Sequence, residues 1–277
     1  MSLKNEYNAE IRTRNYKKIP TELQSVDCLL SVLQNGKYPF VRVKKVHGNY
    51  IRFHTGNGRI KREICDIFLI LRYKDHYRFS FIQNKRQLTN YQTGLSDFKI
   101  DSGQHYFLVK KPNFLYKQKT YTLLKGTKYD TVTAYSVFYQ GNNGTFNFDF
   151  SSAISCICSK RNAFCCCNFT EKCIVSHQYN KIQSKNGTGK LIDFVALSNA
   201  DEIENHPYFG EVVYDSDTKM KQLQNLIKDC AGQDFLDFLE MNTNSVDYIP
   251  ENNDLATTDL IIKNLIAVDC RKLNHIL

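Results

Sequence analysis

The segment 62-REICDIFLILRYKDHYRFSFIQNKRQ-87 has the pattern of a β-hairpin. Two runs of β-branched and aromatic residues flank a short charged turn, KDH. Asp66 interrupts the first run, while Gln83, Asn84 and Lys85 end the second. A strand that serves only for packing has no need of these polar side chains. The hairpin therefore predicts a functional site as well as part of the fold.

Strand alternation predicts that three of these side chains converge. Residues two apart lie on the same face of a strand, so Gln83 and Lys85 share a face. The short turn brings that end of the second strand beside Asp66 at the start of the first. Carboxylate and amide oxygens suit Mg²⁺, and a nearby ammonium can serve a water or stabilise charge on a phosphate. The alternative is a structural role, in which Asp66 and Lys85 form a cross-strand ion pair.

The rest of the chain predicts an α/β fold. A start signal and apolar residues at helical spacing indicate a helix over 20–35. Further strands are expected at 38–46, 50–55, 104–117 and 128–140, and further helices at 217–230, 233–241 and 257–273. We expect an α/β core in residues 1–145 and a helix-rich C-terminal extension in 146–277, the two packed as one domain.

Composition limits the partners and the compartment. Lys and Arg number 37 against 28 Asp and Glu, a net charge of +9 that favours polyanionic partners such as nucleic acids. The N-terminal residues lack the apolar stretch of a secretory signal, and the longest apolar run, DIFLIL, is too short to span a bilayer. Ten cysteines without an export signal favour reduced thiols and a cytoplasmic location, away from membranes. The abundance of Asn, Lys, Tyr and Ile favours an AT-rich, bacterial genome.

Asp66 followed by Gln83-Asn84-Lys85 resembles the PD-(D/E)xK nuclease superfamily, which includes many restriction endonucleases. More narrowly, it is similar to the branch with a Q-x-K motif, and the resemblance covers about residues 20–115. It implies a restriction-endonuclease-like mixed central sheet flanked by helices. It also implies that Asp66 and Gln83 bind Mg²⁺ or Mn²⁺, that Lys85 assists the attacking water, and that Glu22 joins the site from the first helix.

Two details refine this expectation. Gln83 gives the site one negative charge fewer than an acidic residue would, so a one-metal mechanism is expected. Glu63 is a rival carboxylate. Because it lies three residues before Asp66, we expect it on the opposite face of an unbroken strand and outside the site.

The resemblance implies a Mg²⁺-dependent DNA endonuclease of restriction or defence type that hydrolyses phosphodiester bonds. RNA as the substrate and dimerisation are left open. The alternative is a non-cleaving nucleic-acid-binding protein that keeps the nuclease fold. Basic residues around the hairpin are predicted to contact the nucleic-acid backbone, although a solvated basic edge has the same composition. They are Arg52, His54, Arg59, Lys61, Arg62 and Arg86.

A cysteine-rich segment offers a third, weaker hypothesis, a zinc-stabilised interaction module. It holds Cys156, Cys158, Cys165, Cys166, Cys167, Cys173 and His177. These spacings do not match the C-x₂₋₄-C pairs of structural zinc sites. We therefore favour buried thiols that act as small hydrophobic groups. The isolated His105 receives no ligand role, and Phe114 and Tyr121 are predicted to be core residues.

Overall fold

The chain folds around one mixed β-sheet. This computed structural model describes residues 3–16, 19–35, 37–46, 51–55, 58–63, 65–86, 98–141, 144–153, 156–158, 180–184, 210–241 and 262–271. Six strands follow one another across the sheet, and a seventh, β13 (Glu211–Tyr214), pairs with β5. The six are β1 (Val41–Lys45), β14 (Ile262–Asp269), β4 (Cys65–Arg72), β5 (His76–Arg86), β9 (Thr133–Gln140) and β10 (Phe146–Ser152).

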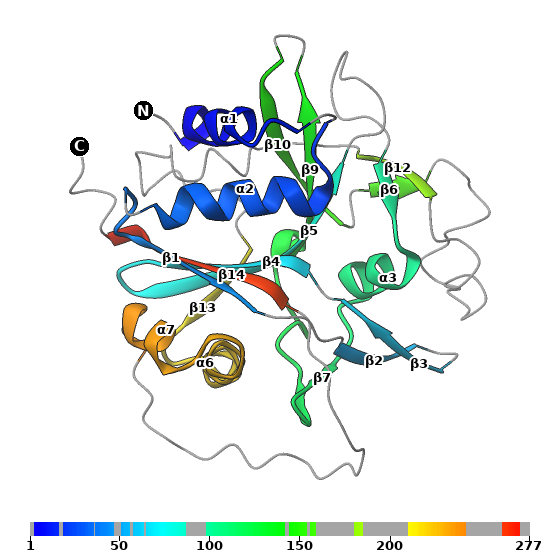
Figure 1. Cartoon of the computed structure of the whole chain (residues 1–277). Helices are drawn as coiled ribbons and strands as arrows, with labels where there is room; N and C mark the ends of the chain where they lie inside the picture. Colours follow the sequence, from blue (N-terminus) through cyan, green and yellow to red (C-terminus); the bar gives the residue numbers. More distant parts are fainter. Residues whose placement is uncertain are drawn as a thin grey trace.

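The sheet mixes parallel and antiparallel pairs. β14 runs parallel to β4, and β5 runs parallel to β9. The pairs β1–β14, β4–β5, β9–β10 and β13–β5 are antiparallel. Figure 1 shows β14, in red, lying between β1 and β4. The expected α/β class with a mixed sheet is therefore confirmed.

Alternation along the predicted hairpin creates two buried faces. Ile67, Leu69 and Leu71 belong to one apolar cluster, while Phe68 and Ile70 belong to the other. All eight residues of β4 are buried, as expected for a central strand covered on both sides. The rings of Phe68 and Phe81 stack across the hairpin with centroids 4.6 Å apart. The hairpin is thus the rigid centre of the fold.

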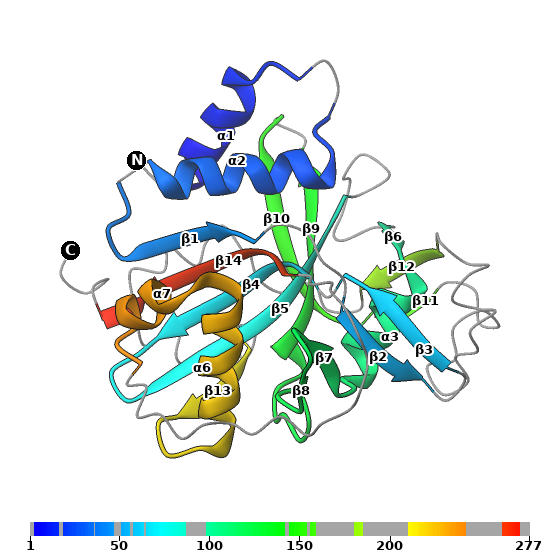
Figure 2. The ribbon, with the colours of Figure 1, turned by 60° about the horizontal axis from the view of Figure 1, so that its bottom comes forward.

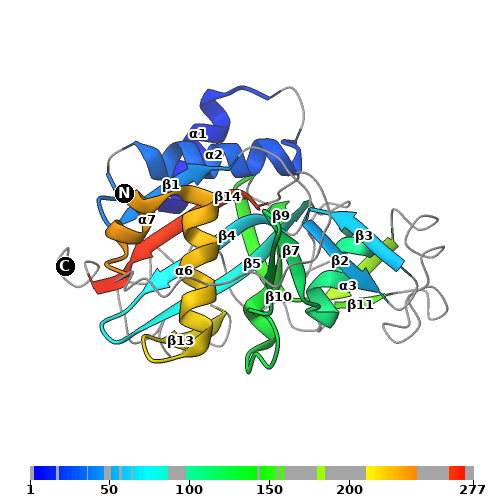
Figure 3. The same ribbon diagram turned by 90° about the horizontal axis from the view of Figure 1, so that it is seen from below.

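Helices cover both faces of the sheet. α1 (Leu3–Thr13) and α2 (Glu22–Gln34) contribute to the cluster that contains Ile67. α3 (Ser102–Lys110), α6 (Thr218–Ala231) and α7 (Gln233–Phe238) contribute to the cluster that contains Phe68. Figure 2 and Figure 3 show α1 and α2 on one side and α6 and α7 on the other. None of the helices in the described ranges combines the length and apolarity needed to cross a membrane.

The predicted first helix is confirmed as α2. Its start is fixed by a capping box, in which Thr21 Oγ1 accepts from Gln24 N at 3.3 Å and Thr21 N donates to Gln24 Oε1 at 2.9 Å. The predicted helices at 217–230 and 233–241 are also confirmed, as α6 and α7. An apolar stripe against the sheet stabilises each of them.

The helix predicted over 257–273 is wrong, because residues 262–269 form the central strand β14. Its apolar residues alternate between the two clusters, with Leu265 and Ala267 in one and Ile266 and Val268 in the other. β10, β13 and β14 all follow residue 145, yet they join the same sheet as β4 and β5. The predicted boundary near residue 145 therefore does not separate two sheets, and the described residues after it are less helical than expected.

The strand predicted over 104–117 is wrong in its first half, where the chain forms α3. Asp101 caps this helix by accepting from Gln104 N at 2.9 Å, and Lys111 ends it in the left-handed conformation at φ 51°. α3 lies between β5 and β9 in the sequence, so it belongs to the crossover that makes these strands parallel. The second half of the segment is the short strand β7 (Phe114–Tyr116).

Two smaller sheets flank the main one. The first has the order β3–β2–β7–β8 and contains β2 (Ile51–Thr55), β3 (Gly58–Arg62) and β8 (Lys119–Tyr121). The second consists of β11 (Cys156–Cys158), β12 (Asn180–Ser184) and β6 (Phe98–Ile100). A 3₁₀ turn, η1 (Asp130–Val132), precedes β9. Phe114 and Tyr121, predicted as core, are 1% and 2% exposed.

Candidate functional site

Asp66 lies near the start of β4, just before the pairing with β5 begins. The pairing of β4 with β5 begins at Ile67 opposite Ile82, one residue beyond Asp66. Beyond the backbone pairing, the Asp66 carboxylate continues the contact between the two strands, because its Oδ2 accepts from the backbone N–H of Asn84 at 2.8 Å. Oδ2 also accepts from the side-chain amide of Gln83. The structure thus brings Asp66 and Gln83 together, at the end of the hairpin where alternation places them.

The cation beside Asp66 comes from the far end of the chain. Lys263, on β14, donates to Asp66 Oδ1 at 2.9 Å. The next residue, Asn264, donates its side-chain amide to the Asp66 backbone carbonyl at 2.9 Å. The ion pairs among the described residues therefore join Asp66 to Lys263, not to Lys85. The alternative of a simple Asp66–Lys85 cross-strand pair does not describe this structure.

Glu63 also belongs to this cluster. β3 ends at Arg62 and β4 begins at Cys65, so no continuous strand joins Glu63 to Asp66, and the alternation argument against it fails. Its carboxylate oxygen lies 2.5 Å from Lys263 Nζ. Burial, followed by repulsion from Asp66, raises the pKa of Glu63 to about 7, although attraction by Lys263 opposes the rise. Two carboxylates thus share one ammonium.

The neighbouring carboxylates also change the pKa of Lys263. Burial alone would lower the pKa of its ammonium, but the negative charges of Asp66 and Glu63 outweigh burial and raise it. Lys263 therefore stays protonated at any physiological pH. Its side chain is 37% exposed, against 8% for Asp66 and 16% for Glu63, so the cation reaches two buried carboxylates from the solvent side.

Lys85 occupies a second, adjoining part of the site. Its side chain is 8% exposed, and its Nζ lies 3.3 Å from Gln104 Oε1 on α3 and 3.9 Å from Glu22 Oε2 on α2. Glu22 is further held by the backbone N–H of Arg86, which donates to its Oε1 at 3.1 Å. Lys85 and Glu22 are therefore neighbours, as the resemblance implies, and helices from both faces of the sheet meet at Lys85.

Asn84 explains why the middle residue of the Q-x-K motif is polar. It points to the opposite face from Gln83 and donates its side-chain amide to Ser25 Oγ at 2.9 Å and to the Glu22 carbonyl at 3.0 Å. These bonds join β5 to the first turns of α2. Asn84 is thus a positioning residue that holds the helix that carries Glu22.

The metal ligands implied by the resemblance were tested against the donor atoms present. Within the described parts of the chain, no three His, Cys, Asp or Glu side chains gather closely enough to form a metal site by themselves. The amide of Gln83 supplies a further oxygen. Its Oε1 is buried and makes no hydrogen bond to any described residue. Asp66 and Gln83 thus carry oxygen donors of the type that Mg²⁺ and Mn²⁺ prefer, with the amide nitrogen of Gln83 facing Asp66.

The predicted nucleic-acid contacts are only partly described. Arg52 and Arg86 are both partly exposed. The structure does not describe the side chains of the other four, His54, Arg59, Lys61 and Arg62. Their backbones form β2 and β3, where Arg52 is opposite Lys61 and His54 is opposite Arg59. Figure 2 shows this hairpin beside α3. The cysteine-rich segment and its proposed zinc role also lie outside the described residues, apart from the backbone of β11.

Besides Glu63, three residues of the site were missed from the sequence, namely Gln104, Lys263 and Asn264. Gln104 was assigned to a strand, and the other two to a helix. A usable signal exists for Lys263 and Asn264, since they interrupt an apolar, β-branched run in the way that Asp66 does. For Gln104 the signal is the Asp101 N-cap three residues earlier.

The chain was compared with models of protein families, with curated proteins and with solved structures. None of them matches. The resemblance to the PD-(D/E)xK superfamily therefore depends on the motif residues and on the geometry around them.

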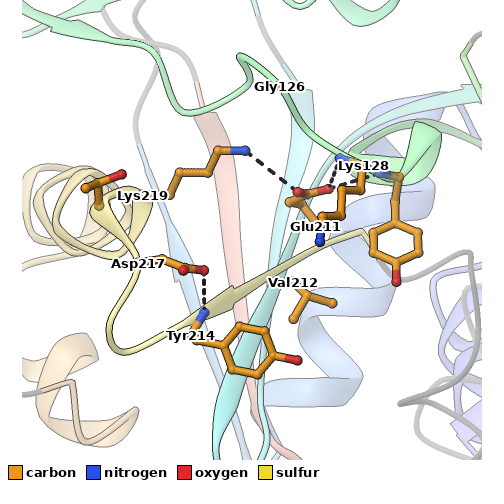
Figure 4. A pocket seen from close by; sticks show the side chains of 9 residues that line it. Gly126, Lys128, Glu211, Val212, Tyr214, Asp217 and Lys219 are labelled. Atoms are coloured by element: carbon orange, nitrogen blue, oxygen red, sulfur yellow. Dashed lines mark hydrogen bonds and ion pairs between the residues drawn. The ribbon is translucent and has the colours of Figure 1, made fainter.

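A separate cavity of about 330 Å³ lies between β13, the start of α6 and the loop at Gly126–Tyr129 (Figure 4). Glu211 is its buried carboxylate. It accepts from the backbone N–H groups of Lys128 and Tyr129 at 2.8 and 3.0 Å, and Lys219 Nζ lies 3.7 Å away. These partners satisfy Glu211, whose role is to attach the loop to β13.

His105, which follows Gln104 on α3, points into the core. It is 2% exposed, and its Nδ1 lies 3.0 Å from Tyr135 Oη. Burial lowers the pKa of His105 to about 4. It is therefore a neutral core histidine, in agreement with the absence of a predicted ligand role.

The native state should lose stability through His105 as the pH falls. Above about pH 6.5 the imidazole is neutral in both states, whereas between pH 6.5 and 4 only the unfolded chain binds the proton. At pH 5 this effect lowers the free energy of unfolding by roughly 2 kcal/mol. His105→Gln keeps a partner for Tyr135 but does not titrate. Urea unfolding should therefore show that His105→Gln loses less unfolding free energy between pH 7.5 and pH 5 than the wild type does. Equal losses would contradict the assignment.

Proposed function

We propose that this protein is a Mg²⁺-dependent DNA endonuclease of restriction or defence type, with a site of the Q-x-K kind. The observation that carries the proposal is that Asp66 contacts Gln83, and Lys85 contacts Glu22, at the same end of the β4–β5 hairpin. A buried carboxylate, an amide oxygen and a buried lysine at one end of a hairpin are groups that metal-assisted phosphodiester hydrolysis can use.

The order of the elements supports a restriction-endonuclease-like core. α2 is followed by β1, by the β4–β5 hairpin, and by the α3 crossover to β9. α2 and α3 pack on opposite faces of the sheet. The resemblance implies the same order of elements, with an initial helix, then a hairpin that carries the site, then an α/β crossover. In this proposal β14 is an added strand between β1 and β4.

Each residue has a distinct task in the proposed reaction. Asp66 and Gln83 would hold the metal, which polarises the phosphate and lowers the pKa of a bound water. Lys85 brings its ammonium group to a buried position, where it can stabilise the charge that develops on the phosphate. Glu22 and Gln104 hold the Lys85 ammonium from two sides and so limit its rotamers. Arg52 and Arg86, which are both partly exposed, would contact the DNA backbone.

The test is DNA cleavage by purified protein. We expect the wild type to nick or linearise plasmid DNA with Mg²⁺ or Mn²⁺ and to be inactive in EDTA. Lys85→Met should reduce the rate about 100-fold or more, because it removes one transition-state charge from a site of low dielectric. Lys110→Met is the matched control, since Lys110 is an exposed lysine on α3. Equal rates for Lys85→Met and the wild type would refute the role of Lys85.

A second candidate function is a non-cleaving nucleic-acid-binding protein. The observation that favours it is that Lys263 already neutralises Asp66, while Gln83 brings no charge. In that case neither the wild type nor Gln83→Glu cuts DNA under any metal condition. DNA affinity would instead fall steeply with salt and be the same in Mg²⁺ and in EDTA. Cleavage by the wild type excludes this candidate.

A further inference from the structure

We propose that Glu63 is the second carboxylate of the metal site and that the Lys263 ammonium holds the place of the divalent cation until a metal displaces it. This inference rests on the metal site of the proposed function. It assigns to Glu63 the negative charge that Gln83 does not provide. It also makes Lys263, on the last described strand, a built-in competitor of the metal.

The position of the ammonium is the first argument. Lys263 Nζ lies 2.9 Å from Asp66 Oδ1 and 2.5 Å from Glu63 Oε1. A cation is therefore already bound between the two carboxylates. Gln83 completes the arrangement, because its buried amide lies against Asp66 and its Oε1 makes no hydrogen bond to any described residue. Rotating this amide by a half-turn exchanges its nitrogen for an oxygen donor toward the cluster.

Charge is the second argument. When both carboxylates are ionised, Asp66, Glu63 and Lys263 together carry a net charge of −1, because two carboxylates face a single ammonium. A divalent cation in place of the ammonium would bring this sum to zero. Mg²⁺ and Mn²⁺ prefer carboxylate and amide oxygens, and these are the donors that Asp66, Glu63 and Gln83 offer. The exchange of a lysine for a divalent ion thus improves the charge balance of the buried site.

Mobility is the third argument. The carboxylates are 8% and 16% exposed, but the Lys263 side chain is 37% exposed. Its ammonium can move toward solvent by a change of rotamer, without opening the core. The backbone of Lys263 stays fixed, because its neighbours Ile262 and Asn264 pair with Cys65 and Ile67 of β4. The strand holds the lysine within reach of the site while its side chain is free to leave.

The test measures Mn²⁺ binding by titration calorimetry in the absence of DNA. Lys263→Met removes the competing charge and should bind Mn²⁺ at least 10-fold more tightly than the wild type. Glu63→Gln removes one ligand charge and should bind at least 10-fold more weakly. Lys228→Met and Glu240→Gln change exposed residues of the same types on or next to the helices α6 and α7, and should bind as the wild type does.

Two further measurements cover the case in which Lys263→Met does not fold without metal. Lys263→Arg keeps a permanent charge that binds carboxylates, so it should fold and should bind Mn²⁺ no more tightly than the wild type. The melting temperature of Lys263→Met should rise more on addition of Mn²⁺ than that of the wild type. Tighter binding by Lys263→Arg, or no additional rise for Lys263→Met, would overturn the competitor role.

The inference and the proposed function fail separately. Glu63→Gln with wild-type affinity for Mn²⁺ overturns the ligand role of Glu63, even if the wild type cuts DNA. Conversely, the expected pattern of Mn²⁺ affinities without any DNA cleavage supports this inference and removes only the nuclease activity.

Discussion

Asp66→Asn should reduce metal-dependent DNA cleavage about 1,000-fold or more. The substitution keeps the size and shape of the side chain but removes the charge that the proposed metal requires. It also leaves one acceptor oxygen for three donors, the Gln83 amide, the Asn84 backbone N–H and the Lys263 ammonium. We therefore expect a loss of roughly 2–4 kcal/mol in the free energy of unfolding as well.

A matched variant separates these two effects. Asp269, at the other end of β14, is also buried and ion-paired, with Arg271 Nε and Nη2 at 2.8 and 2.9 Å from its two oxygens. Asp269→Asn should lose a similar amount of stability but retain cleavage. The measurements are initial rates on supercoiled plasmid and urea unfolding of both variants. If Asp66→Asn and Asp269→Asn cut DNA equally well, Asp66 does not hold the metal.

Gly210→Ala should destabilise the protein by about 3 kcal/mol or more, or prevent folding. Gly210 precedes β13 and has φ +94°, a conformation that costs an alanine about 1–3 kcal/mol. A Cβ added there would lie 1.9 Å from the backbone oxygen of Phe79, on the strand with which β13 pairs. The two backbones would have to move apart, and the β13–β5 pairing would be lost.

Gly232→Ala is the control for Gly210→Ala. Its φ of +92° is nearly the same, but nothing lies within 4 Å of the added Cβ. The difference in unfolding free energy between the two variants therefore reports the clash with Phe79 and Ser80 of β5. We expect Gly232→Ala to lose about 1–3 kcal/mol from backbone strain. Equal stability of the two variants would show that β13 does not lie against β5 as described.

Local signals predicted the parts of the fold that local interactions determine. The capping box of α2 involves only Thr21 and Gln24, three residues apart. Likewise, the alternation of β4 and β5 and their short turn specify the hairpin without any other element. Asp66 and Gln83 meet because of that hairpin alone, so the centre of the site was accessible from the sequence.

Long-range pairing accounts for most of what was missed. A short apolar run such as that of residues 262–268 is compatible with a helix or a buried strand, and only its place between β1 and β4 decides which. Lys263 is 197 residues from Asp66, so no local pattern could join them. Glu63 was misjudged for a different reason, since the argument assumed a continuous strand where β3 and β4 are separate.

The central position of β14 has a consequence for the newly made chain. β14 follows β4 by almost two hundred residues, and ribosomes add roughly 5–20 residues per second. For some tens of seconds, β1 and β4 therefore have no strand between them, and each presents an unpaired edge. During that interval Asp66 and Glu63 also lack the ammonium that pairs with them. The nascent protein must be protected from aggregation until its last described strand has been made.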